Sequence, residues 1–290
     1  MHPAPSVIIF TTFSGLGFGL LFWLGIDATP PKGWVGFAFF ALAYLFAVGG
    51  LLSSTFHLGH PERFLKAFSQ WRSSWLSREG IASVLTLITM GFYGLGLVFF
   101  GAVWQPLGYL GALGALATVF TTAMIYTQMK TVPRWRHWTT PALFLTLSLG
   151  GGALLAARIE IALVLLVIAG ALQLLAWQAG DKSFTNNADT LASATGLGHI
   201  GKVRAFEPPH TGTNYLLREF AYDVGRKHAF NLRIIGLGLG FIVPVLMLLA
   251  PIGHFGAGIA ILSHIIGILA LRWLFFAQAE HVVGLYYGKH

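Results

Sequence analysis

The stretch VGFAFFALAYLFAVGGLLSSTF (Val35–Phe56) indicates the class of fold, because it contains no charged residue. A helix needs about 20 mostly apolar residues to cross a bilayer, and lipid leaves no water to satisfy unpaired backbone groups. This stretch therefore predicts a transmembrane helix, and seven others resemble it. The eight predicted spans are Ser6–Ile26, Val35–Phe56, Gly80–Gly101, Leu107–Tyr126, Thr140–Ala157, Ile161–Trp177, Leu232–Ala250 and Gly256–Phe276.

The composition agrees with an all-α integral membrane protein. The chain has 290 residues, of which 56% are hydrophobic and 10% charged, whereas soluble domains average about 25% charged residues. We expect a single eight-helix membrane domain over residues 1–290. Its first apolar stretch has no Lys or Arg before it and no small-residue cleavage pattern after it, which favours a retained helix over a signal peptide. The absence of cysteine excludes disulfides and thiolate ligation of iron–sulfur clusters by this chain.

The distribution of Lys and Arg predicts the orientation. With eight spans, both termini and the connections 2–3, 4–5 and 6–7 lie on one side, and this side carries 16 of the 18 basic residues. Only Lys32 and Arg158 fall on the other side. Cytoplasmic loops carry the excess of Lys and Arg. Both termini are therefore expected in the cytoplasm, in a bacterial inner membrane.

The connections on the predicted outer side are very short, so a soluble partner has room only on the cytoplasmic side. The longest connection, residues 179–231, is expected to be a cytoplasmic docking loop, since long loops are usually functional or disordered. The alternative is that basic loops follow the topology rule and contact anionic lipid. The candidate docking residues are Arg72, Arg78, Arg134, Arg136, Arg204, His210 and Arg218.

Titratable residues gather where the second predicted helix ends and the third begins. His57 and Arg63 lie in FHLGHPERF (Phe56–Phe64), and Glu79 lies in SWLSREG (Ser74–Gly80). Ionisable groups at a membrane edge are costly and are functional candidates. A quinone head group needs hydrogen-bond partners and a proton route, which a histidine and a carboxylate can supply. The alternative is structural: His57 caps its helix, and Glu79 pairs with Arg78 or Arg63.

His264 lies inside the last predicted span, at a depth where its imidazole must pair with another group. It either bonds a Ser or Thr of another helix or acts as an axial ligand of a b-type haem, with His57 or His228 as the second ligand. The chain contains no P-loop, G-x-S-x-G or H-E-x-x-H motif. A secondary transporter would need a polar site near mid-membrane, for which His264 is the only indication.

Three segments resemble the membrane-anchor subunits of dimethyl sulfoxide reductase-type molybdoenzymes, the DmsC family. STFHLGHPERFLKAFSQWRSSWLSREG (Ser54–Gly80) resembles the family signature His-Leu-Gly-x-Pro followed by Ser-x-Leu-Ser-x-Glu. TVPRW (Thr131–Trp135) is similar to the segment after the family's fourth helix. EPPHTGTNYLLREFAYDVGRKHAFNLR (Glu207–Arg233) resembles the long loop of the branch that anchors a cytoplasmic sulfite-oxidising enzyme.

The resemblance implies an eight-helix anchor that exchanges electrons with ubiquinone or menaquinone. The implied quinone site comprises His57, Gly59, Arg63 and Glu79. The implied partners are a subunit with [4Fe–4S] clusters and a catalytic subunit with molybdopterin guanine dinucleotide. The catalytic residues then lie outside this chain. With the predicted topology, we expect electrons to pass from cytoplasmic sulfite oxidation to quinone. The alternatives are a quinol-oxidising anchor of a dimethyl sulfoxide-type reductase, a purely structural anchor and a secondary transporter.

Overall fold

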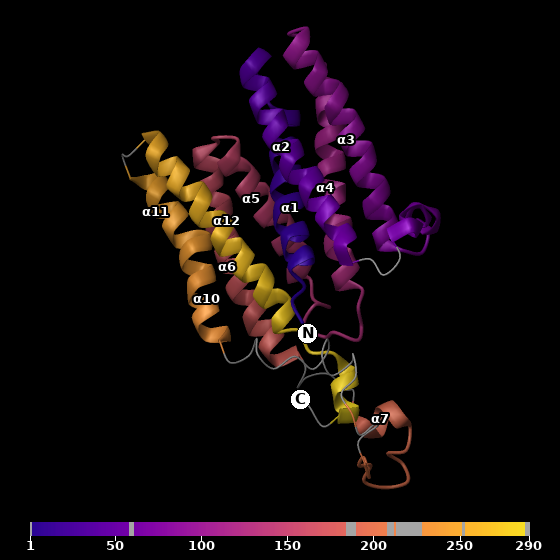
Figure 1. The fold of residues 1–290 in the computed structure, drawn as a ribbon. Helices are drawn as coiled ribbons and strands as arrows, with labels where there is room; N and C mark the ends of the chain where they lie inside the picture. Colours follow the sequence, from indigo (N-terminus) through magenta and orange to yellow (C-terminus); the bar gives the residue numbers. More distant parts are fainter. Residues whose placement is uncertain are drawn as a thin grey trace.

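The computed structural model describes residues 2–57, 61–183, 190–207, 212, 228–250 and 253–287. Every regular element within these ranges is a helix, which confirms the all-α prediction. The long helices lie side by side in a bundle (Figure 1). The elements are α1 (Pro5–Ile26), α2 (Gly33–Ser53), η1 (Ser54–His57), η2 (Pro61–Gln70), α3 (Trp75–Phe99), α4 (Gln105–Thr127), α5 (Thr139–Leu155), α6 (Ile159–Ser183), α7 (Leu191–Thr195), α10 (Ala229–Leu237), η3 (Gly238–Ile242), α11 (Val243–Leu249), α12 (Gly253–Ala277) and η4 (Val282–Tyr287).

Seven helical segments of the described chain are long and apolar enough to cross a membrane, with α10, η3 and α11 counted as one. The prediction of many membrane-crossing helices is confirmed. The eighth candidate, α5, has 17 residues, fewer than the roughly 20 that usually span a bilayer. The count of eight spans therefore stays a prediction, as does the side on which the termini lie.

The predicted start of the third span is wrong. Helix α3 begins at Trp75 rather than at Gly80, because the Ser74 side chain caps it by accepting a hydrogen bond from the Ser77 backbone N–H at 3.4 Å. Glu79 is consequently not at the edge of the helix but inside it.

The predicted limits of the long loop are also too wide. Helix α6 extends to Ser183, six residues beyond the expected end, and α10 already begins at Ala229. Both ends of the predicted loop 179–231 are thus helical. The described part of the connection contains the short helix α7, which begins with a capping box at Thr190 and ends at Gly196 with φ +68°.

Several connections meet at one end of the bundle, which we call the basic end. Asp181, near the end of α6, accepts hydrogen bonds from Arg134 of the α4–α5 connection and from Arg233 of α10. The Val282 N–H of η4 donates to the Thr131 carbonyl at 3.0 Å. Figure 1 shows the N-terminus and η4 at this same end.

The opposite end is held by an ion pair between Asp27, after α1, and Arg158, between α5 and α6. Burial raises the pKa of Asp27, but hydrogen bonds from Arg158 and Thr29 and the charge of Arg158 lower that pKa below its ordinary value of 3.8. Asp27 therefore stays ionised at neutral pH. Because α5 begins beside Arg134 and ends beside Arg158, it runs from the basic end to the opposite end.

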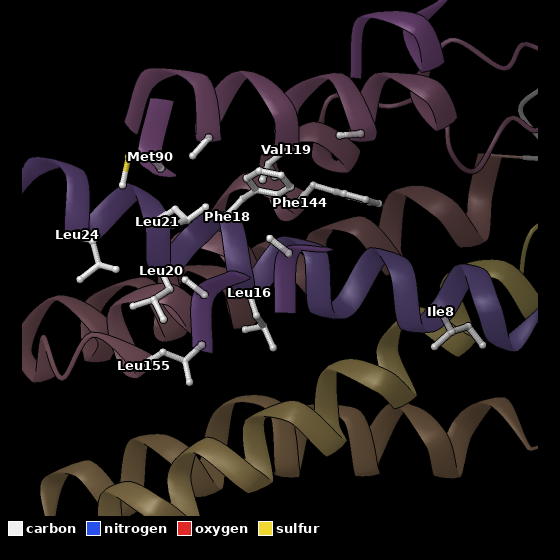
Figure 2. Packing of buried hydrophobic residues seen from close by; sticks show 14 of the residues in the cluster. Ile8, Leu16, Phe18, Leu20, Leu21, Leu24, Met90, Val119, Phe144 and Leu155 are labelled. Atoms are coloured by element: carbon white, nitrogen blue, oxygen red, sulfur yellow. The ribbon is translucent and has the colours of Figure 1, made fainter. Parts of the chain in front are cut away.

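Helix α1 forms the centre of the bundle and packs against α2, α4 and α5. Its buried side chains, among them Phe18 and Leu21, meet Met90 of α3 and Phe144 of α5 (Figure 2). Helices α2, α3 and α4 lie on one side of α1, and α10, α11 and α12 lie on the other (Figure 1).

Small residues let α1 and α5 approach closely. A Cβ atom on Gly152 would lie 2.7 Å from the Cα atom of Gly19, so neither helix tolerates a larger residue at this crossing. Ser148 donates a hydrogen bond to the Gly15 carbonyl at 2.6 Å across the same interface. This is the small-residue packing typical of membrane helices.

Candidate functional site

Glu79 is a buried carboxyl group in the first turns of α3, close to the basic end. Its exposed fraction is 4%. The Thr122 hydroxyl of α4 lies 2.5 Å from Glu79 Oε1. The structural alternative expected Glu79 to pair with Arg78 or Arg63. Arg78 does not pair with Glu79 and instead donates to the backbone carbonyls of Trp71 and Arg72. The side chain of Arg63 lies outside the described part of the structure.

The contacts of Thr122 allow Glu79 to hold a proton. The Thr122 oxygen lies 2.5 Å from Glu79 and 2.9 Å from the Thr118 carbonyl oxygen. A hydroxyl group carries one hydrogen and cannot donate fully to both acceptors. Both contacts become full hydrogen bonds when Glu79 is protonated and donates to Thr122, which then donates to Thr118. When Glu79 is ionised, Thr122 can turn its hydrogen to the carboxylate.

Threonines extend this polar contact along the α3–α4 interface. The hydroxyl oxygens of Thr118 and Thr86 lie 3.4 Å apart, and both residues are buried. We call Glu79, Thr122, Thr118 and Thr86 the threonine seam. Gly114 makes room for its inner end, because a Cβ atom there would lie 2.5 Å from the Thr86 oxygen.

The threonine seam reaches a groove between α3 and α4 at Thr86. The groove has a volume of about 500 Å³, which is within the size range of small-molecule sites. Its polar groups are few, and its walls are mostly aliphatic. Glu79 does not line it. The lining residues are Trp71, Arg78, Ile81, Ala82, Leu85, Thr86, Thr89, Leu110, Leu113, Gly114 and Ala117.

Arg78 and Trp71 form the polar end of this groove. The Arg78 guanidinium stacks on Trp75, with 4.3 Å between Cζ and the ring centroid. It also donates to the Trp71 carbonyl at 2.9 Å. The groove thus has a cationic, aromatic end and an apolar length, which matches a head group with a long apolar tail.

The other predicted quinone residues belong to the connection between α2 and α3. His57 is the last residue of η1, which packs against α1 and α2, and Arg63 belongs to η2, which packs against α3. Gly59 lies outside the described residues, as do the side chains of His57 and Arg63. Phe68 of η2 lies against Gly80, where a Cβ atom would be 3.2 Å from its ring. The η2 segment thus covers α3 directly beside Glu79.

His264 has a structural partner that differs from the predicted Ser or Thr. Its Nδ1 lies 2.7 Å from the Gly240 carbonyl oxygen in the π-helical segment η3. In a regular helix that carbonyl would accept from residue 244, but this residue is Pro244, which has no N–H. His264 supplies the missing donor. Its buried Nε2 has no hydrogen-bond partner within the part of the chain that the structure describes.

The proposed haem ligands are not brought together. His228 is the residue before α10, and twelve residues of helix separate it from Gly240, the partner of His264, or roughly 18 Å at 1.5 Å per residue. The separation of His228 from His264 therefore does not fit a haem held between these two residues. The other candidate for the second ligand, His57, has its side chain outside the described part of the structure.

The predicted docking arginines fall into three groups. Arg72, Arg136 and Arg204 are exposed. Arg134 is partly buried and paired with Asp181, and Arg78 is bound to its own segment. His210 and Arg218 lie outside the described residues. Sequence reasoning also placed Arg272 with the cytoplasmic charges, but this residue lies inside α12 and is only 5% exposed.

The threonine seam was missed by reasoning from the sequence. Its only signal is the run TVFTTAMIYT (Thr118–Thr127), which carries four threonines in an otherwise apolar span. Ser and Thr are common at membrane helix interfaces, so the run alone does not identify a site. The contact with Glu79 depends on how α3 is aligned with α4.

The fold and the site define an integral membrane bundle with a buried acid near one end. A family model described as DMSO reductase anchor subunit (DmsC) matches residues 1–180, more than half of the chain. The chain therefore belongs to the DmsC family of membrane-anchor subunits.

A relative supports the same family over the whole length. The chain is 31% identical to a subunit of the sulfite dehydrogenase of Allochromatium vinosum, over 99% of each chain. No solved structure gives a significant match. The protein is thus a multi-pass anchor subunit of an oxidoreductase complex of the DMSO reductase and sulfite dehydrogenase type.

Proposed function

We propose that this chain is the quinone-reactive electron-transfer subunit of a molybdenum and iron–sulfur oxidoreductase, and that it passes electrons from cytoplasmic sulfite oxidation to quinone. The observation that carries the quinone part is the buried Glu79, linked by threonines to an apolar groove with a cationic end. The sulfite part rests on the likeness to a component of a sulfite dehydrogenase.

The groove between α3 and α4 fits a quinone by its chemistry. Its aliphatic walls suit an isoprenoid tail, and Arg78 at its end can donate hydrogen bonds to a carbonyl oxygen. The η2 segment, which carries Arg63, packs against the start of α3, and His57 ends η1 in the same connection. We infer that His57 donates to the second carbonyl, with Gly59 giving the backbone room to approach.

Glu79 is proposed to hold and release the protons that quinone reduction consumes. Reduction of a quinone to a quinol takes two electrons, supplied by the iron–sulfur partner, and two protons from water. Thr122 can follow either protonation state of Glu79 by turning its hydroxyl. The threonine seam places polar groups between this carboxyl group and the groove, which Thr86 lines. Water would carry the protons to the ring, because the Thr118 and Thr86 hydroxyls already donate to the Gly114 and Ala82 carbonyls.

The proposed partners dock at the basic end. The iron–sulfur clusters must belong to another polypeptide, since this chain has no cysteine. The exposed residues Arg72, Arg136 and Arg204 provide positive charge for an acidic partner surface. The molybdopterin subunit would bind through the iron–sulfur subunit, on the cytoplasmic side.

The test is to purify the chain with its bound proteins and to assay sulfite-dependent reduction of a soluble quinone analogue. We expect an iron–sulfur polypeptide and a molybdopterin polypeptide to copurify, and quinone reduction to require sulfite. If the complex oxidises quinol only when an S-oxide or N-oxide is supplied, it is a reductase anchor and the sulfite assignment is wrong. If no redox polypeptide copurifies, the electron-transfer role is wrong.

A further inference from the structure

A second cavity lies near the basic end between α5, α6 and α12, away from the α3–α4 groove. Its volume is about 50 Å³, so it has room for only a small group. Its deeper wall is aliphatic and includes Leu143 and Leu147. The polar residues that line it are Arg134, Thr139, Thr140, Gln173, Arg272 and Gln278. None of the described residues that line it is acidic.

Arg272 is the most unusual of these residues, because it is a buried cation without a counterion among the described residues. It is 5% exposed, and its Nε has no hydrogen-bond partner. No hydrogen bond or ion pair joins it to another described residue. The centroid of the Phe144 ring lies 3.6 Å from its Cζ, and the buried phenol of Tyr126 is close enough to interact with its charge. A buried charge is costly unless it is paired, so the buried guanidinium favours an anion beside it.

Asp181, which pairs with the cavity residue Arg134, does not neutralise Arg272. Asp181 is already shared between Arg134 at 2.7 Å and Arg233 at 2.6 Å. Arg134, Arg233 and Arg272 together with Asp181 carry a net charge of about +2, because arginines are always protonated. The Asp181 cluster therefore adds to the positive field of the cavity instead of cancelling it.

Two amide groups provide further donors toward the cavity. With its amide oriented to satisfy its neighbours, Gln278 accepts from Arg233 at 2.8 and 3.1 Å, which leaves its NH2 group free to donate. Gln173 is 8% exposed and forms no hydrogen bond with another described side chain or backbone group. Together with the planar Arg272 fork, these groups can donate to several oxygens of one anion.

We propose that this cavity binds one tetrahedral oxyanion, held by Arg272 with Gln173 and Gln278. The phosphodiester of an acidic phospholipid and free inorganic phosphate share this chemistry. Basic pockets between membrane helices on the cytoplasmic side bind anionic lipid head groups, and the acyl chains of such a lipid would stay outside this small cavity. The site does not depend on the proposed quinone function.

The test uses the complete detergent-purified complex after delipidation. Native mass spectrometry and thermal stability are measured with dioleoylphosphatidylglycerol, dioleoylphosphatidylcholine and inorganic phosphate. We expect one phosphatidylglycerol per chain, with a rise in Tm, and weaker binding of the zwitterionic lipid. Arg272→Gln should weaken this binding by at least roughly 10-fold, since it removes a charged bidentate donor. Lys130→Gln, an exposed charge change at the same end, should not.

The two sources give different results. If millimolar phosphate displaces phosphatidylglycerol, the site takes the free anion. If phosphatidylglycerol binds and inorganic phosphate does not, the site takes the lipid. If Arg272→Gln does not assemble, Gln173→Leu replaces it, with an expected loss of several-fold. The proposal is overturned if neither anion binds, if phosphatidylcholine binds equally well, or if Lys130→Gln weakens binding as much as Arg272→Gln.

Discussion

Glu79→Gln is expected to lower sulfite-driven quinone reduction by roughly 100-fold or more, the usual range for loss of a general acid–base group. Glutamine keeps an oxygen that can accept from Thr122 at the same position, so the α3–α4 contact should survive. What it loses is the ability to take up and release a proton. The measurement is kcat with sulfite and a quinone analogue on the purified complex.

Two further variants test whether the loss of turnover is specific to the proposed quinone site. Glu160→Gln changes an exposed carboxyl at the opposite end of the bundle and should leave kcat unchanged. His57→Ala should show a loss of turnover similar to that of Glu79→Gln. The partner subunits must remain bound in all three variants. Undiminished turnover in a fully assembled Glu79→Gln complex would mean that Glu79 has only a structural role.

Reversing the positive charges of Lys202 and Arg204, in the connection between α6 and α10, is expected to release the partner subunits. Lys202→Glu combined with Arg204→Glu changes the local charge by four units at two exposed positions. Like charges placed across an interface cost several kcal/mol, so we expect the copurified iron–sulfur and molybdopterin subunits to fall by at least roughly 10-fold. Quantitative mass spectrometry of the complex, purified at low salt, measures the ratio.

The matched control for this variant is Lys32→Glu, a residue before α2 at the opposite end. It should leave the partners bound, because the proposed docking surface lies at the basic end. Partner release by Lys32→Glu instead would place the docking surface at the other end. The two variants thus also test at which end of the bundle the partners dock.

The sequence predicted the helices well because long apolar runs leave few other conformations in lipid. It placed the start of α3 too late, because Arg78 and Glu79 look like loop residues. In the structure, the side chains of Arg78 and Glu79 make contacts that a loop would not provide. Arg78 stacks on Trp75 and bonds backbone carbonyls, and Glu79 turns inward to Thr122.

Contacts between helices could not be predicted in the same way. The pairing of Glu79 with Thr122 depends on the register of α3 against α4, which apolar composition does not encode. The partner of His264 depends on Pro244, which leaves the Gly240 carbonyl without its helical donor. Arg272 was counted as a cytoplasmic charge because loop and helix positions near a membrane edge look alike in sequence, yet it is buried.

The most direct test of the quinone site is photoaffinity labelling of the intact complex with an azido-quinone, followed by peptide mapping. The groove and the threonine seam predict labelling of residues 61–89 and 105–122, suppressed by excess unlabelled quinone. Competable labelling confined to α6, to α10–α12 or to the partner subunits would contradict the account.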